Sequence, residues 1–268
     1  MGSGAGDAIG VFDSGVGGLT VLRAIHARLP AEHTLYLGDS ARMPYGAKSA
    51  ETVTRYALAA ADFLSKMHIK ALVVACSTAS SVALPALRQH LNVPVIGVVD
   101  AGVTRALAAS RGKGVAVAAT EGTVRSQAYQ RGLAHSAPGV RVVARACPLF
   151  APLVEEGTVE GALAQAVVSH HLGDLTQQDV DTLILGCTHY PLLRASIAAV
   201  LGPDVEIVDG ALGVADELAH ILTDGGLLAT GPNAGQRRYF ATDAPDRLQV
   251  LGSRFLGAPV PLVELAEL

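Results

Sequence analysis

Two apolar segments of this chain end in the same way. Residues 71–80 read ALVVACSTAS, and residues 182–191 read TLILGCTHYP. In each segment a run of strand-like apolar residues stops at a small residue, a cysteine follows, and a hydroxyl residue comes next. The chain has only three cysteines, so two of them lie at the predicted ends of buried strands.

The segments around these two cysteines repeat as well. Predicted strands alternate with predicted helices, a pattern typical of a parallel sheet covered on both faces. The predicted strand at 9–13 corresponds to 115–119, and Cys76 corresponds to Cys187, with offsets of 106 and 111 residues. These similar offsets indicate one duplicated unit of domain size.

We therefore predict an α/β protein of two similar parallel-sheet domains related by pseudo-twofold symmetry. The first domain comprises residues 1–98 together with 210–268, so the tail returns to it, and the second comprises residues 99–209. Within these limits the pattern predicts a strand at 93–99 and one continuous helix at 121–133.

A cleft between two such domains is the expected active site. In open α/β sheets, ligands bind outside the carboxyl ends of the strands. Four predicted strand-end residues would face this cleft: Asp13, Cys76, Thr120 and Cys187.

Each of the two cysteines also lies between a strand and a helix. Free backbone N–H groups and the positive end of the helix dipole favour a thiolate at such a position. Two opposed thiols suit one reaction particularly well, because one can remove a proton from a carbon acid while the other delivers a proton to its opposite face. This would be a racemisation without a cofactor.

Composition excludes several other classes of protein. The 20 basic and 24 acidic residues give a net charge of −4, so nucleic acid is not an expected partner. No apolar run is long enough to span a bilayer. The N-terminal residues carry no secretory signal, and an odd number of cysteines argues against a disulfide framework, so we expect a cytoplasmic protein.

Several longer motifs resemble the glutamate racemases of the aspartate/glutamate racemase superfamily. The matching segments include VFDSGVGGLTVLR at 11–23, GDSARMPYG at 38–46, CPLFAPLVEEG at 147–157 and LGCTHYPLL at 185–193. The resemblance implies an interdomain active site, no PLP or metal, and interconversion of L- and D-glutamate for peptidoglycan precursors. As partners we expect glutamate and, in a homodimer, a second copy of the chain.

The resemblance also implies roles for individual residues. Cys76 and Cys187 would be the catalytic acid/bases, with Asp13 assisting Cys76. His189 would assist Cys187 together with Glu155, which directly follows the PLV segment and is preferred over Glu156. The implied substrate-binding residues are Asp13, Ser14, Pro44, Tyr45, Gly46, Ser77, Thr78, Thr120, Thr123, Thr188 and His189.

One departure and several alternatives stay open. The family usually has asparagine where this chain has Ser77, whose hydroxyl has a shorter reach than an amide. The protein could instead be an aspartate or broad-specificity amino-acid racemase. A thiol-based redox or regulatory protein is a third reading, although no CxxC pair exists. A metal site at Cys187 and His189 would need a third ligand that the sequence does not reveal.

Overall fold

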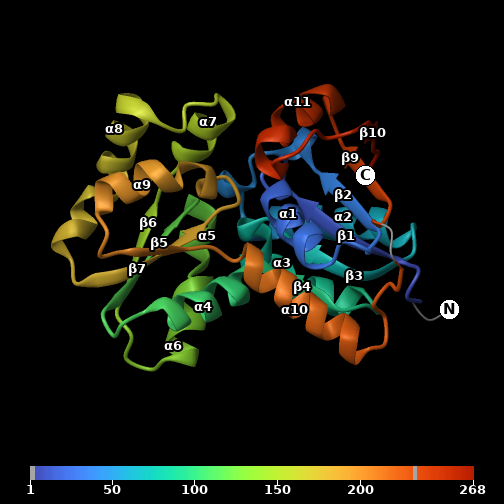
Figure 1. Cartoon of the computed structure of the whole chain (residues 1–268), viewed down its shortest axis with the longest axis horizontal. Helices are drawn as coiled ribbons and strands as arrows, with labels where there is room; N and C mark the ends of the chain where they lie inside the picture. Colours follow the sequence, from blue (N-terminus) through green and yellow to red (C-terminus); the bar gives the residue numbers. More distant parts are fainter. Residues whose placement is uncertain (1–3, 232–233) are drawn as a thin grey trace.

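Two separate parallel sheets form the framework of the protein. The structure, a computed structural model, describes residues 4–231 and 234–268. One sheet has the order β10 (Val263–Leu265), β9 (Arg237–Ala241), β2 (Thr34–Gly38), β1 (Ala8–Asp13), β3 (Ile69–Val74) and β4 (Val95–Gly97). The other has the order β6 (Val142–Ala146), β5 (Gly114–Ala119), β7 (Val180–Gly186) and β8 (Glu206–Val208). Figure 1 shows the sheets in two lobes, which confirms the predicted fold class.

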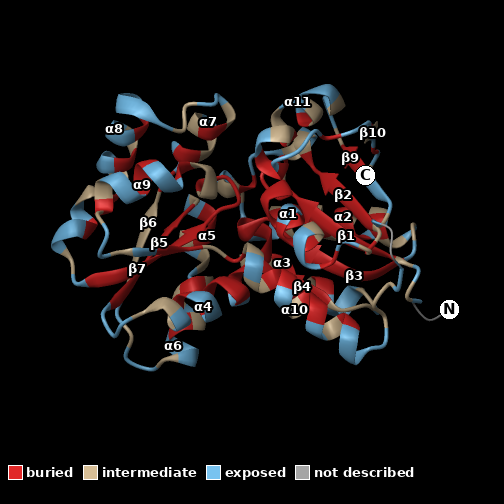
Figure 2. Ribbon diagram, viewed as in Figure 1, coloured by how far each residue is buried: buried red, intermediate tan, exposed pale blue. Residues whose placement is uncertain are grey.

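The two sheets have the same internal order. Strands β2-β1-β3-β4 correspond to β6-β5-β7-β8. Even the irregularities match, because the register with the neighbouring strand shifts after Ala8 in β1 and after Gly114 in β5. The central strands β1, β3, β5 and β7 are buried along their whole length, so near-continuous apolar runs are needed there (Figure 2).

Helices cover the faces of both sheets. The α-helices are α1 (Leu19–Arg28), α2 (Ala50–Ser65), α3 (Ser77–His90), α4 (Val98–Ala109), α5 (Glu121–Ser126), α6 (Ala128–Ser136), α7 (Phe150–Glu155), α8 (Gly161–Leu172), α9 (Arg194–Leu201), α10 (Ala211–Asp224) and α11 (Pro245–Leu256). Short 3₁₀ helices occur at Ser40–Arg42, Tyr45–Ala47, Gly173–Gln177 and Tyr190–Leu193. Among the described residues, no helix has the length and hydropathy to cross a membrane.

Two of the sequence-based element predictions were wrong. The predicted strand at 93–99 is shorter, because Val98 and Val99 already form the first turn of α4. The buried side chains of Val99, Val103 and Ala106 belong to one core cluster and that of Val98 to another, so this helix is packed on two sides. The predicted helix at 121–133 is interrupted at Gln127, whose φ of 56° is left-handed and separates α5 from α6.

Helices α4 and α10 connect the two sheets. Each follows the last strand of one four-stranded repeat and leads toward the other sheet. They pack closely through small residues: a Cβ added to Gly210 would lie 2.4 Å from the carbonyl oxygen of Val98, and one added to Gly213 would lie 3.0 Å from the Ala101 Cβ. The two crossing points of the chain therefore lie side by side.

The tail adds strands to the first sheet. Strand β9 pairs in parallel with β2, and β10 pairs in parallel with β9. The domain limits themselves, 1–98 with 210–268 and 99–209, stay a prediction. Residues 1–3 and 232–233 within those ranges lie outside the described residues.

Candidate active site

Four predicted residues lie at carboxyl ends of the central strands. Asp13 is the last residue of β1, and Thr120 directly follows β5. Cys76 is the N-cap residue of α3 after β3, and Cys187 directly follows β7. Because the two sheets turn these ends toward each other, the loops meet between the lobes (Figure 1).

Cys76 lies beside a serine and a buried carboxyl group. Its thiol is directed at the Oγ atom of Ser14, 3.5 Å away. Asp13 is fully buried; its Oδ2 atom accepts a hydrogen bond from the Gly15 N–H at 3.0 Å, and its Oδ1 atom has no partner among the described residues. Burial, followed by the nearby charge of Asp13, raises the pKa of Cys76 to about 12. Cys76 is therefore a thiol at neutral pH.

Cys187 faces a histidine instead. The Sγ atom of Cys187 is 3.9 Å from Nδ1 of His189, and the Nε2 atom of that ring is 3.1 Å from Oε1 of Glu155. The other carboxylate oxygen of Glu155 accepts a hydrogen bond from Arg247 at 3.3 Å. A line of polar groups thus runs from the thiol to the surface of the protein.

Hydrogen bonds between these groups favour their charged forms. Burial lowers the pKa of His189, but hydrogen bonds to Cys187 and Glu155 outweigh it and raise the pKa to about 10. The hydrogen bond from His189 lowers the pKa of Glu155, against the opposing effect of burial. His189 therefore carries a proton and a positive charge next to Cys187 at neutral pH.

Two glycines of the DSGVGG segment allow these groups to approach each other. A Cβ added to Gly17 would lie 2.2 Å from Oγ1 of Thr188 and 2.5 Å from Nδ1 of His189. A Cβ added to Gly18 would lie 2.5 Å from the Cβ of Asp13. A side chain at Gly17 would push the two sides of the cleft apart, and a side chain at Gly18 would displace Asp13.

Three predicted threonines form a hydrogen-bonded cluster across the cleft. The Oγ1 atom of Thr78 in α3 is 2.9 Å from that of Thr120 and 3.3 Å from that of Thr123. The Thr120 hydroxyl also caps α5 by accepting from the Thr123 N–H. The structure thus brings hydroxyl groups of both lobes together at the N-termini of α3 and α5.

The predicted loop at 44–46 closes over the same place. The Tyr45 hydroxyl donates a hydrogen bond of 2.5 Å to Oδ2 of Asp39, and burial followed by that carboxylate raises the pKa of Tyr45. A Cβ added to Gly46 would lie 2.8 Å from the Cβ of Thr120. Pro44 precedes this turn and is joined to Met43 by a cis peptide bond. The loop therefore packs on the second lobe.

The two residues that follow the cysteines are also buried. The backbone carbonyl of Thr188 accepts a hydrogen bond from the Thr20 hydroxyl at 3.2 Å. Ser77 lies within hydrogen-bonding reach of Tyr129, where it opposes the effect of burial, which raises the pKa of that tyrosine. Ser77 and Thr188 are thus each held in place by a residue from a distant part of the chain.

Several of these supporting residues were not among those predicted from the sequence. Asp39 directly follows strand β2, and Asp13 is the last residue of β1, so the strand-end position of Asp39 was a signal that could have found it. Thr20, Tyr129 and Arg247 lie inside helices with no local signal, and only the packing of distant segments brings them to the site.

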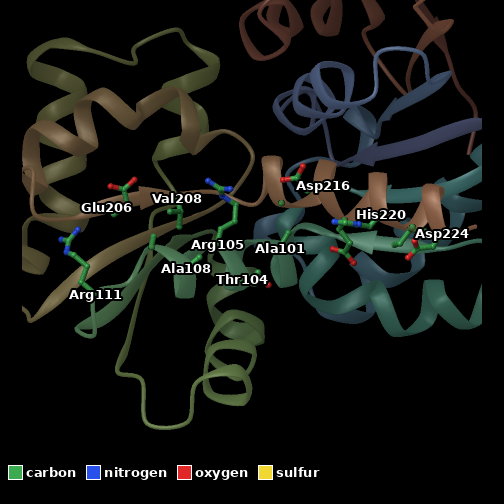
Figure 3. A pocket seen from close by; sticks show the side chains of 14 residues that line it. Ala101, Thr104, Arg105, Ala108, Arg111, Glu206, Val208, Asp216, His220 and Asp224 are labelled. Atoms are coloured by element: carbon green, nitrogen blue, oxygen red, sulfur yellow. The ribbon is translucent and has the colours of Figure 1, made fainter. Parts of the chain in front are cut away.

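A small cavity lies beside Cys187. It is bordered by Ser77, Tyr129 and Cys187 and has a volume of about 20 Å³, which is room for about one water molecule. A second cavity of about 900 Å³ lies elsewhere, between α4, β8 and α10 (Figure 3). It is lined by residues such as Arg105 and Glu217 and contains none of the predicted site residues.

A redox protein would use cysteines that can form a disulfide, and a metal site would need at least three ligands close together. All three cysteines are free thiols. Across residues 4–231 and 234–268, no group of three or more His, Cys, Asp or Glu side chains is placed to hold a metal ion.

The two-lobed α/β fold, with a cysteine after equivalent strands of its two sheets, defines a class of two-lobed α/β isomerases. This chain belongs to the Asp/Glu/Hydantoin racemase family, whose sequence profile matches residues 9–218. It is 51% identical to a glutamate racemase of Geobacter metallireducens over 93% of each chain. Its structure is similar to that of a glutamate racemase from Bacillus anthracis, with a TM-score of 0.93, 40% identity and 98% of each chain covered. It is also similar to the glutamate racemase of Francisella tularensis in complex with D-glutamate, with a TM-score of 0.92, 35% identity and the same coverage.

Proposed function

We propose that this protein is a glutamate racemase that interconverts L- and D-glutamate by two-base proton transfer at the α-carbon. The observation that carries the proposal is the placement of Cys76 and Cys187 after equivalent strands of the two sheets. Relatives at 42–51% identity over nearly their full length are glutamate racemases, which supports glutamate as the substrate.

The surroundings of the thiols suggest how protons move. With L-glutamate, the thiolate of Cys187 takes the α-proton while the positive charge of His189 stabilises that thiolate before the transfer. The thiol of Cys76 then gives its proton to the opposite face of the carbanion, which leaves a Cys76 thiolate. With D-glutamate, the same steps run in reverse. One proton is removed and one is added, so the reaction balances.

The hydroxyl cluster supports a role in binding the substrate. Free N–H groups at the N-termini of α3 and α5 attract anions, and the glutamate carboxylates are anions. The residues that we expect to bind the substrate are Asp13, Ser14, Pro44, Tyr45, Gly46, Ser77, Thr78, Thr120, Thr123, Thr188 and His189. We propose that the hydroxyl groups of Thr78, Thr120 and Thr123 exchange their mutual hydrogen bonds for bonds to substrate.

Access to the thiols requires movement. Cys76 is 5% exposed and Cys187 is 9% exposed, and the cavity beside Cys187 is far smaller than a glutamate. The lobes are joined by two adjacent connections, α4 and α10, which could serve as a hinge. We therefore propose that the lobes separate to admit substrate and close during proton transfer, which excludes water from the carbanion.

The cellular role follows from the activity. We propose that the enzyme works in the cytoplasm as a homodimer and supplies D-glutamate for peptidoglycan synthesis. The three free cysteines support a reducing compartment. Light scattering of the purified protein would test the dimer.

The first prediction is racemisation without an added cofactor. The chain has four lysines, and the buried one, Lys70, is near the amino end of β3, where it pairs with Glu32 at 2.5 Å, so it is not available as a cleft lysine for PLP. Circular dichroism should show L- and D-glutamate each converging to the racemate. Prior treatment with a chelator and hydroxylamine should leave the rate unchanged.

Two results would contradict this proposal. Activity that is lost on treatment and restored by PLP or a divalent metal would refute the cofactor-independent mechanism. Equal or higher kcat/KM for aspartate than for glutamate would move the assignment to an aspartate or broad-specificity racemase.

A further inference from the structure

Helix α11 of the tail reaches the Cys187 side of the cleft. It packs against α1 and β9 of the first lobe, and it faces α7 of the second lobe across the top of the gap (Figure 1). It lies beyond residues 9–218, the part that matches the family profile.

Two side chains of α11 contact the hydrogen-bonded groups next to Cys187, namely Glu155 and His189. Arg247 Nη2 donates to Oε2 of Glu155 at 3.3 Å. The fully buried ring of Phe255 meets the His189 ring edge-on, with centroids 5.1 Å apart and an interplanar angle of 76°. One helix of the first lobe therefore touches both His189 and the carboxylate that holds it.

Glu155 has both carboxylate oxygens engaged. Oε1 meets Nε2 of His189, and Oε2 meets Arg247. A carboxylate held at both oxygens cannot rotate freely about its last side-chain bond, so its direction toward His189 is fixed. That ring in turn presents Nδ1 to Cys187.

We propose that Arg247 is a positioning residue for the Cys187 half of the reaction. It holds Glu155 so that Glu155 keeps His189 aligned with the Cys187 thiolate. This inference rests on the proposed racemase function and names a further residue of the same site.

The effect of Arg247 is on geometry rather than on folding. Its side chain is 66% exposed, and exposed ion pairs contribute little to stability. Misplacement of a catalytic group by about 1 Å can nevertheless cost on the order of 100-fold in rate. Loss of Arg247 should therefore change turnover while the melting temperature stays the same.

Racemisation alone cannot locate such a defect. Two enantiomers have equal free energies, so the ratio of kcat/KM in the two directions is fixed at one for every variant. Chloride elimination from 3-chloroglutamate avoids this constraint, because abstraction of the α-proton expels chloride and no second thiol is needed. The L form reports on Cys187 as base, and the D form reports on Cys76.

The test compares Arg247→Gln with a matched control, Arg238→Gln. Arg238 is also in the tail and forms an ion pair with a glutamate, Glu264, at 2.7 Å, but on β9 away from the cleft. In Arg247→Gln we expect racemisation in both directions and elimination from the L form to fall by about tenfold, with elimination from the D form unchanged. Arg247→Lys, which keeps the charge, should recover part of the loss, and Arg238→Gln should match wild type in every assay.

The possible outcomes separate this inference from the proposed function. Equal losses with both chloro substrates, or no loss with either, would overturn the positioning role while leaving an active racemase. A wild-type protein that does not racemise glutamate would overturn the proposed function, and this inference with it. A selective loss with the L form supports both.

Discussion

Thr78 and His189 occupy equivalent places in the two repeats, two residues after Cys76 and Cys187. The Thr78 hydroxyl belongs to a cluster of threonine hydroxyls, whereas His189 contacts Glu155, which in turn contacts Arg247. On the Cys76 side, burial and then the charge of the nearby buried carboxyl group of Asp13 raise the pKa of the thiol. On the Cys187 side a protonated imidazole faces the thiol.

This difference teaches that a symmetric scaffold need not carry symmetric chemistry. Matched strand orders place two thiols in equivalent positions, but the charges beside them differ in sign. A negative neighbour favours the neutral thiol, and a positive neighbour favours the thiolate. Proton transfer across one carbon needs one acid and one base at a time, and neighbours of opposite charge stand beside the two thiols.

The largest predicted effect comes from removing either thiol. Cys76→Ala and Cys187→Ala should each reduce racemisation by at least about 10³-fold, because each direction needs both an acid and a base. Elimination from 3-chloroglutamate should survive in one form only: the L form in Cys76→Ala and the D form in Cys187→Ala. Chloride release can be followed directly.

Cys147 offers the control for this comparison. Cys147 is fully buried, and the Tyr190 hydroxyl donates a hydrogen bond to its backbone carbonyl rather than to its thiol. Cys147→Ala should therefore still eliminate chloride from both the L and the D form. Near wild-type racemisation by either of the first two variants would contradict the two-thiol mechanism. Elimination from the same form in both would contradict the opposed-face arrangement.

A smaller effect should appear in the titration of Cys76. In a variant that lacks Cys147 and Cys187, alkylation of Cys76 by iodoacetamide should still be rising above pH 9, because burial raises the pKa of this thiol and the thiolate is the reactive form. Asp13→Asn removes a negative neighbour, so the midpoint of this rise should move down and labelling at pH 9 should become faster. Peptide mass spectrometry can measure both rates.

Asp224→Asn is a suitable control for that titration, since Asp224 is exposed on α10. It should leave the midpoint unchanged. An Asp13→Asn midpoint that stays the same or rises would show that the charge of Asp13 does not act on Cys76.

The smallest effect is expected at Ser77. This residue borders the small cavity beside Tyr129 and Cys187, so the larger amide of Ser77→Asn has space next to it. We expect kcat/KM for glutamate to change by less than about tenfold, with glutamate still preferred over aspartate. Complete loss of activity would show that this position does not do here what asparagine does in the family.

Much of the framework could be predicted before the structure was known. Alternation of apolar strands with helices predicted the fold class, and the offsets between repeats correctly matched β1 with β5 and Cys76 with Cys187. Local breaks were harder to predict. The interruption at Gln127 and the early start of α4 at Val98 depend on packing that a short apolar run does not encode.

Chain connectivity and the burial of apolar runs fix locally which residues stand at strand ends, so those positions could be predicted from the sequence. Which of these residues meet depends on the packing of segments that are distant in the chain. The contact between Arg247 and Glu155 joins residues 92 positions apart in different lobes, and the cluster of Thr78 with Thr120 also crosses the cleft. Such contacts depend on how two separately formed sheets are held by α4 and α10, and no local pattern of residues encodes that orientation.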